Sequence, residues 1–177
     1  MSKVVCGGVP AHSQLSGRLS KRSFSDSLSF SLDDPNLSPA QVYVNIFGQL
    51  PAAVTAMMAL RNRLVRPLGF AVSSEPEVLS VELLEQGTSD GLHQVEWLSD
   101  EEIICTTQDR HMQVSLSVLK SGEGQFTLST LVNTHTWIGY GYLLVIVPFH
   151  KVIALASVRS AIKRAERSSG ENKKAEH

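Results

Sequence analysis

The chain has 177 residues, 42% of them hydrophobic and 19% charged, with a formal net charge of −1 at pH 7. These values are typical of one globular domain and exclude a disordered or collagen-like chain. The charge is unevenly distributed, because residues 26–158 carry six basic and fourteen acidic groups. So acidic a region repels the phosphates of nucleic acids. We therefore exclude nucleic acids as partners.

The first 22 residues are rich in serine and glycine and carry four basic groups without an acid. They contain no apolar run long enough for a secretory signal, so we predict a flexible basic N-terminal tail over residues 1–22. The two cysteines, Cys6 and Cys105, form no C-x-x-C pair and no disulfide framework. This cysteine usage favours a reducing compartment, and we expect a cytoplasmic protein.

A strand and two helices are predicted next. Leucine and phenylalanine alternate with serine over residues 27–32, the pattern of a strand with one buried face. Ser38 followed by Pro39 is typical of a helix start, because serine caps free N–H groups and proline fits the first helical position. This helix ends near Gly48. A second helix follows over residues 51–69, with apolar residues at three- and four-residue steps on one side.

The middle of the chain is predicted to form consecutive antiparallel strands. Apolar and polar residues alternate there, and short segments containing glycine or aspartate separate the alternating stretches. Strands joined by short turns are typical of an antiparallel meander. The expected strands cover residues 78–84, 92–98, 103–107, 111–119 and 125–134.

The last predicted element is one long helix that begins at Trp137 and bends at Pro148, since proline lacks the N–H group that a helix needs. It ends near Arg167, and residues 168–177 are expected to be disordered. Its uninterrupted apolar part covers 13 residues, fewer than the roughly 20 that cross a bilayer, so we expect no membrane span. The helix face expected to contact the sheet consists of Ile138, Tyr142, Val145, Phe149, Val152, Ile153 and Ala156.

The order of these elements is similar to a helix-grip arrangement. This is an α+β fold in which a curved antiparallel sheet wraps around a long C-terminal helix, with two helices after the first strand. Four groups of residues also resemble a bacterial family, domain of unknown function 2867, over roughly residues 22–165. We expect a single domain over residues 23–167. The four groups are Leu60–Val65 with Gly69, Asp109–His111, Gly139 with Tyr142, and Pro148–His150.

The resemblance implies kinship with the polyketide-cyclase and lipid-transfer superfamily, whose members hold a cavity between sheet and helix. It implies no established activity. Some members occur fused behind short-chain reductase domains, which implies an association with a reductase, and a homodimer is the other protein partnership we consider. Tyr140 departs from the family pattern, in which an arginine also occurs at this position. If that arginine binds a ligand elsewhere in the family, this chain lacks it.

Arg61 is the most informative residue for binding. It falls on the apolar side of the second helix, where an unpaired guanidinium group is costly. It therefore either pairs with an acid or faces a cavity and binds an anionic or carbonyl group. Aromatic and histidine side chains are expected to line the same pocket with it. The ligand-binding candidates are Arg61, His111, Trp97, Tyr142, Phe149 and His150.

Asp109 and His111 are the catalytic candidates. A carboxylate two residues from an imidazole could orient it as a general base, but an aspartate in a hairpin turn more often binds turn backbone. His111, His135 and His150 match no local metal motif, so no metal is predicted. Gly139-x-Gly141 lacks the third glycine and the parallel unit of a dinucleotide site, so no cofactor is expected.

Three functions follow from these candidates. The first is a module that binds a small apolar or amphipathic molecule between the sheet and the last helix, oriented by Arg61, His111 and Tyr142. The second is a cyclase- or hydrolase-like enzyme with His111 as its base. The third is a structural or interaction protein with a filled core and a dimer surface on its second helix.

Overall fold

A computed structural model describes residues 4–20, 23–70, 79–87 and 93–175, apart from the side chains of Leu68 and of residues 168–175. Its centre is an antiparallel sheet of six strands in the order β1-β2-β6-β5-β4-β3. This α+β fold, with a curved sheet against a long C-terminal helix, is the fold class expected from the sequence. The strands are β1 (Val5–Gly7), β2 (Ser23–Ser31), β3 (Gln94–Leu98), β4 (Glu102–Gln108), β5 (Met112–Gly122) and β6 (Gln125–Thr134).

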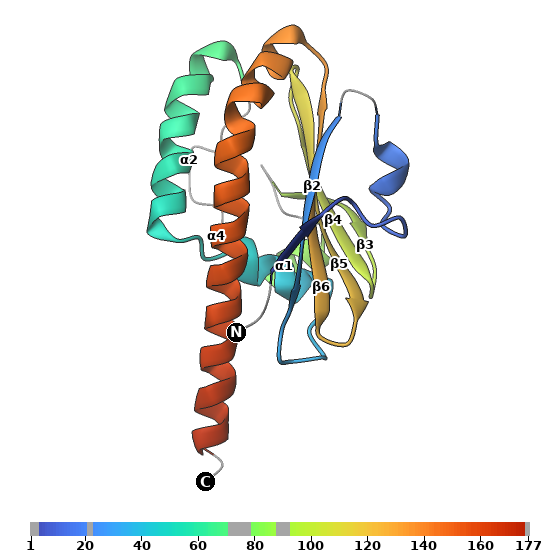
Figure 1. The fold of residues 1–177 in the computed structure, drawn as a ribbon, viewed down its shortest axis with the longest axis vertical. Coiled ribbons are helices and arrows are strands. Elements are labelled where there is room, and N and C mark those ends of the chain that lie inside the picture. The colour runs from blue at the N-terminus through green and yellow to red at the C-terminus, as the bar shows by residue number, and fades with distance from the viewer. Residues whose placement is uncertain (1–3, 21–22, 71–78, 88–92, 176–177) are drawn as a thin grey trace.

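The helices cover one side of the sheet. Figure 1 shows α2 and the long α4 side by side, with the sheet beyond α4 and α1 near its lower half. Helix α1 contacts α4 and strands β4 and β5, and α4 contacts β2 and β6. The helices are α1 (Pro39–Phe47), α2 (Ala52–Val65), α3 (Val81–Glu85) and α4 (Trp137–Ala175), with short 3₁₀ turns at Ser16–Arg18 and Arg66–Leu68.

Local signals place the first two helices as predicted. Ser38 accepts a hydrogen bond from the backbone N–H of Gln41, and the Gln41 side chain accepts one from the Ser38 N–H. This reciprocal capping box satisfies two backbone donors that a helix start leaves free. After α2, Gly69 takes the left-handed conformation with φ of 80°, which glycine adopts without strain and which ends the helical segment.

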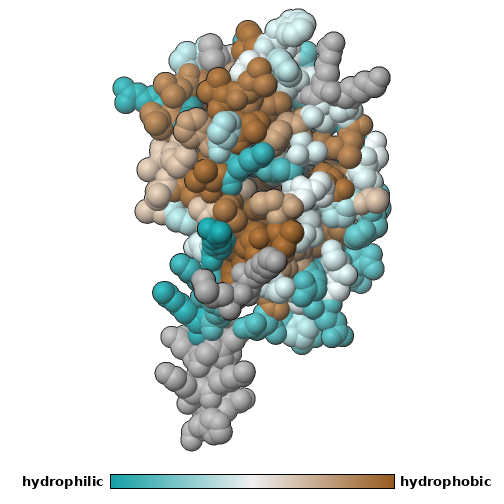
Figure 2. Space-filling view, in the orientation of Figure 1, coloured by the Kyte–Doolittle hydropathy of each residue, from teal (hydrophilic) through white to brown (hydrophobic). Residues whose placement is uncertain are grey.

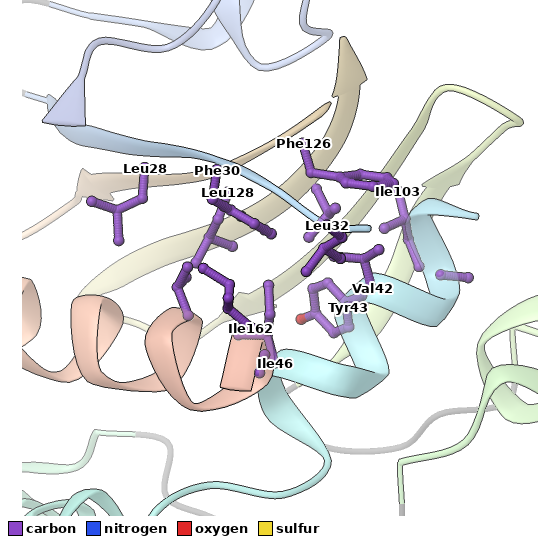
Figure 3. Packing of buried hydrophobic residues seen from close by; sticks show 14 of the residues in the cluster. Leu28, Phe30, Leu32, Val42, Tyr43, Ile46, Ile103, Phe126, Leu128 and Ile162 are labelled. Carbon is purple, nitrogen blue, oxygen red and sulfur yellow. The ribbon is translucent and has the colours of Figure 1, made fainter. Parts of the chain in front are cut away.

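The main core lies between the sheet, α1 and the second half of α4. Leu28 and Phe30 of β2, and Leu32 directly after it, point toward the helices, as the alternation with serine predicts. They meet Tyr43 and Ile46 of α1, and Figure 3 shows this packing from close by. Burying a side chain of this size contributes about 1.5–3 kcal/mol, so this cluster dominates the stability of the fold. From α4 the main core includes Ala154, Val158, Ala161 and Ile162.

A second, smaller cluster lies at the other end of the sheet, where α4 begins. We call it the small core. It joins the end of α2, the start of β5 and the end of β6 to the first turns of α4. Its buried members are Val65, Phe70, Met112, Val132 and Leu143.

Residues 4–20 of the N-terminal segment have a defined structure, which corrects the prediction of a flexible tail for these residues. β1 pairs antiparallel with β2, and the segment that follows lies on the face of the sheet opposite the helices (Figure 1). Leu15 is fully buried there against Ile104 and Leu131. The few apolar residues of this serine- and glycine-rich stretch have no regular spacing, so the burial of Leu15 cannot be predicted from local pattern.

Hydrogen bonds hold the N-terminal segment on Glu102, whose residue exposure is only 3%. The Ser13 hydroxyl donates to Glu102 Oε1 at 2.6 Å, and the Gln14 backbone N–H donates to Oε2 at 2.9 Å. The Ser117 hydroxyl of β5 donates to Oε1 at 2.5 Å. A buried carboxylate needs several donors, so this arrangement ties segment and sheet together.

Two further predictions need correction. The strand expected over residues 78–84 is the helix α3 from Val81 onward, because the Ser80 hydroxyl caps it by accepting from the Leu83 N–H; residue 78 lies outside the described residues. The C-terminal helix continues to Ala175, eight residues past the predicted end at Arg167. Pro148 lies inside α4 without ending it.

The face of α4 that meets the sheet also differs from the prediction. Val145, Phe149 and Val152 are exposed, and the buried side carries Leu143, Ala154 and Val158. The first half of α4 has apolar residues nearly all round, so periodicity alone cannot tell which side faces the sheet.

Candidate functional site

Residues far apart in the sequence converge where α2, the start of β5 and the start of α4 meet. We call Arg61, Phe70, His111, Thr136 and Tyr142 the arginine–histidine cluster. Phe70 lies between the two polar ends of this cluster, with its ring centroid 4.7 Å from that of His111 and 4.7 Å from that of Tyr142. The structure therefore brings together Arg61, His111 and Tyr142, the three orienting groups named from the sequence.

Arg61 is half-buried and contacts both ring and hydroxyl of Tyr142. Its Nε donates to the Tyr142 hydroxyl oxygen at 2.7 Å, and its guanidinium carbon lies 5.4 Å from the centre of that ring. A second nitrogen, Nη1, donates to Asn62 Oδ1 at 2.9 Å. These contacts fix the direction of the guanidinium group, since each hydrogen bond from a charged donor contributes about 1.5–3 kcal/mol.

His111 is buried, with 3% exposure, and both of its ring nitrogens are engaged. Arg110 Nε donates to His111 Nε2 at 2.9 Å, and His111 Nδ1 lies 2.9 Å from Thr136 Oγ1. Arginine is a donor only, so Nε2 must accept, and the ring proton then sits on Nδ1 and points at Thr136. This arrangement makes His111 a neutral bridge between the β4–β5 turn and the start of α4.

Asp109 stabilises the β4–β5 turn through hydrogen bonds to its backbone. Its Oδ1 accepts from the backbone N–H groups of His111 and Met112, at 2.7 and 2.9 Å. This is the turn role that the sequence already favoured for Asp109 over orienting a base.

Two glycines let these parts approach closely. A Cβ atom on Gly139 would lie 2.5 Å from the backbone oxygen of His111. One on Gly69 would lie 2.8 Å from Arg110 Nη2. The first distance is far inside van der Waals contact with backbone, so the start of α4 can sit against the β4–β5 turn only because residue 139 lacks a side chain.

A belt of polar side chains lies on the helix-facing side of the sheet, between the main core and the small core. Asp26 of β2 and Thr130 of β6 are register partners. His150 of α4 lies opposite them, with Nε2 at 3.4 Å from Asp26 Oδ1. Ser157 lies two helical turns further along the same side of α4. We call Asp26, Thr130, His150 and Ser157 the polar belt.

Two atoms of the polar belt are unsatisfied. His150 Nε2 and Ser157 Oγ are buried and have no hydrogen-bond partner within the described residues. The approach of His150 to Asp26 is an ion-pair distance when the ring is protonated, but it does not have hydrogen-bond geometry. Buried polar atoms in proteins are nearly always hydrogen-bonded, so this pair calls for an explanation.

The remaining candidates lie elsewhere. Phe149 is exposed on the outer side of α4. Trp97 lies on β3, at the far edge of the sheet, where it pairs with Ile104 and thus belongs to the face that the N-terminal segment covers. Neither therefore joins the arginine–histidine cluster.

A cavity of about 420 Å³ lies between α1 and the second half of α4. Asp34, Asn45 and Arg164 are among its polar lining residues. The Arg164 guanidinium group donates to the backbone oxygen of Asn45 and to the Ser160 hydroxyl, so it braces α4 against α1. The predicted place of the ligand, between the sheet and α4, is a different part of the molecule.

Metal and thiol chemistry find little support. Among the described residues no three His, Cys, Asp or Glu side chains gather as a metal site would require. Burial raises the pKa of the Cys105 thiol to about 11, against a smaller opposing effect of the hydrogen bond with Tyr43. Cys105 therefore stays protonated and poorly nucleophilic near neutral pH.

Sequence reasoning missed Phe70, Thr136 and three members of the polar belt, Asp26, Thr130 and Ser157. For Asp26 a signal was present: extending the alternation of β2 backwards from Leu28 places residue 26 on the inward face. For Ser157 and Thr136 no local signal exists, because only the packing of α4 decides where they point.

Comparison with known proteins gives a family match. The family described as "Protein of unknown function (DUF2867)" matches residues 18–157. That range includes the whole arginine–histidine cluster and the whole polar belt. Searches of curated proteins and of solved structures find no match.

Proposed function

The chain belongs to the DUF2867 family of proteins of unknown function, and from the geometry of its site we propose that it binds a small amphipathic molecule between the sheet and the part of α4 from Tyr142 to Ser157. The observation that carries the proposal is the pair of buried, unsatisfied atoms in the polar belt, His150 Nε2 and Ser157 Oγ. A polar group of a ligand placed there would form the hydrogen bonds that both atoms lack in the buried state.

The arginine–histidine cluster supplies the second anchor. Arg61 is held by Tyr142 and Asn62, and it is a suitable partner for a carboxylate or carbonyl group. Tyr142 and His150 are eight residues apart on α4, or about 12 Å along the helix axis. The small core lies beside this stretch. A ligand with an apolar chain and a polar group at each end would therefore have a matching surface along its whole length.

His111 supports this proposal as a positioning residue. It is neutral, buried and bonded at both ring nitrogens, and it connects the β4–β5 turn to the start of α4. A general base needs a free lone pair directed at the substrate. The lone pair of Nε2 is occupied by Arg110, so the enzyme hypothesis with His111 as base is the weaker one.

The binding test uses dodecanoate and its ω-hydroxy derivative as probes, measured by isothermal titration calorimetry with the full chain. Arg61→Met is expected to weaken both probes about tenfold or more, the loss of one charge-assisted hydrogen bond. Arg63→Met is the matched control, since Arg63 lies on the same helix but is exposed. Equal affinities of the two variants, or no saturable one-to-one binding by the folded protein, would contradict the proposal.

Ser157→Ala tests the polar belt separately. Removing an unsatisfied buried hydroxyl is expected to stabilise the free protein by about 1 kcal/mol, which raises the melting temperature by roughly 2–4 °C. The same variant is expected to lose selectively the affinity for the ω-hydroxy probe. A variant that is less stable, or that binds both probes as the parent does, would show that Ser157 is satisfied by other means.

A further inference from the structure

An exposed apolar surface covers α2 and the first half of α4. We call it the apolar ridge. Its members are 40–82% exposed, with Trp137 the most exposed of them. Figure 2 shows brown hydrophobic surface over the upper part of the molecule, where α2 and the start of α4 lie side by side in Figure 1. The apolar ridge consists of Leu60, Leu64, Trp137, Ile138, Tyr140, Leu144, Val145, Phe149 and Val152.

This surface brings nine exposed apolar side chains together. Single exposed apolar side chains are common on proteins, but a continuous apolar patch of more than a few hundred Å² marks a site of interaction. On α4 the ridge residues recur at steps of about one and two turns from Trp137 to Val152, a stripe along one side of the helix. The opposite side of α4 holds Leu143, Ala154 and Val158 in the two cores.

The two stretches of chain that form the ridge carry charges of one sign. Residues 52–70 and 137–165 contain no aspartate or glutamate, while they contain seven lysine and arginine residues. The rest of the chain carries all the acids, although the protein as a whole has a net charge of only −1. Five of the seven cations are exposed: Arg63, Arg66, Lys151, Arg159 and Lys163.

We propose that the apolar ridge and its cations dock on the surface of a lipid bilayer with anionic headgroups. Helices that lie in the interfacial plane have this combination, with apolar and aromatic residues on one side and lysine or arginine beside them. Trp137 and Tyr140, whose rings contact edge to face, are of the type that concentrates at the headgroup level. Each cation near an anionic surface adds roughly 1 kcal/mol of attraction.

A second copy of the chain fits the same surface less well. A two-fold dimer presents the same patch on both subunits. The cations of one copy would then approach those of the other, with no acid from residues 52–70 or 137–165 to compensate. A bilayer with anionic lipids supplies the complementary charge.

Docking also accounts for α4 better than a transmembrane orientation does. Residues 137–167 form a helix long and apolar enough to cross a bilayer, and only 22% of its most apolar window is buried. However, Leu143 belongs to the small core and Ala154 to the main core. A spanning helix would have to remove both side chains from these cores and place Lys151 in the hydrocarbon, at a cost of several kcal/mol. Docking needs neither change.

The test is co-sedimentation of the purified full chain with vesicles of phosphatidylcholine and phosphatidylglycerol in equal parts. Strong binding is expected, falling at least about tenfold in high salt or with phosphatidylcholine alone. Val145→Asp, at a ridge position 67% exposed, is expected to reduce binding by a factor of about ten or more, since it removes an aliphatic contact and adds a negative charge. Val5→Asp is the matched control, because Val5 is 50% exposed on β1, away from the ridge, and it should bind as the parent does.

Trp137 provides an independent readout. With Trp97→Phe as background, the Trp137 emission is expected to shift to the blue on addition of these vesicles. Three results would overturn the proposal. They are no binding by folded protein, a dimer in solution that Val145→Asp dissociates, and protein that resists extraction by high salt and alkali as a spanning chain does. The docking test is independent of the dodecanoate test, so either proposal can fail alone.

Discussion

Replacing Glu102 by glutamine should release the N-terminal segment. The Glu102 carboxylate accepts three hydrogen bonds, from Ser13, Gln14 and Ser117, at 2.5–2.9 Å. A glutamine has one acceptor oxygen and one NH₂ group. The NH₂ group must therefore face either the Gln14 N–H or the two hydroxyls that now donate.

The expected loss can be worked from these three bonds. Hydrogen bonds to a charged group contribute about 1.5–3 kcal/mol, and neutral ones about 0.5–1.5 kcal/mol. Weakening three of them by about 1 kcal/mol each costs roughly 3 kcal/mol. For a chain of this size, that corresponds to a fall in melting temperature of roughly 6–12 °C.

Thermal unfolding followed by circular dichroism measures this change, and limited trypsin digestion reports on the segment. Arg18, held in an ion pair with Glu96, should be cleaved faster in Glu102→Gln. Glu101→Gln is the matched control, because Glu101 is an adjacent exposed glutamate. If the two variants melt at the same temperature and Arg18 is cleaved equally fast in both, Glu102 does not hold the segment.

Two further predictions concern Cys105 and the start of α4. The folded pKa of Cys105, about 11, lies above the ordinary value of 9.0, so its contribution is complete below about pH 9 and is lost as the pH rises toward 11. Urea unfolding should show a loss of up to about 3 kcal/mol over this range that Cys105→Val lacks, and identical pH profiles would contradict it. Gly139→Ala should destabilise by about 2 kcal/mol or more, because the new Cβ meets the His111 backbone oxygen. Gly141→Ala, with open space around it, should stabilise by roughly 0.5–1 kcal/mol; equal melting temperatures for the two variants would show that α4 can shift freely.

Local chemistry made much of the fold predictable. Residues close together in the sequence determine several features of the fold. They are the capping pair of Ser38 and Gln41, the helix end at Gly69 and the alternation along β2, β5 and β6. The prediction of a strand near residue 80 was wrong because a short alternating pattern there coincides with a helix-capping serine. The Leu83 N–H donates a hydrogen bond to the Ser80 hydroxyl, and this cap favours a helical turn over a strand.

The site was predictable only in part. Arg61 and Tyr142 could be chosen because each is a polar group in an otherwise apolar segment, and His111 because a carboxylate lies two residues before its imidazole; the structure brings all three together. Trp97 and Phe149 were chosen for their size, and size does not determine which face of a strand or helix a residue occupies. The orientation of α4 depends on long-range packing, which the nearly uniform apolarity of its first half leaves undetermined.

The place of Ser13, Gln14 and Leu15 has a practical consequence for anyone shortening this protein. The family match begins at residue 18, so a gene trimmed to that boundary would encode a protein without all three. Ile104 and Leu131 would then face water, and β2 would become an unprotected outer strand. Edges of that kind recruit other chains, so the shortened protein should self-associate more strongly than the full chain. Aggregation of such a shortened protein would then be a consequence of the truncation.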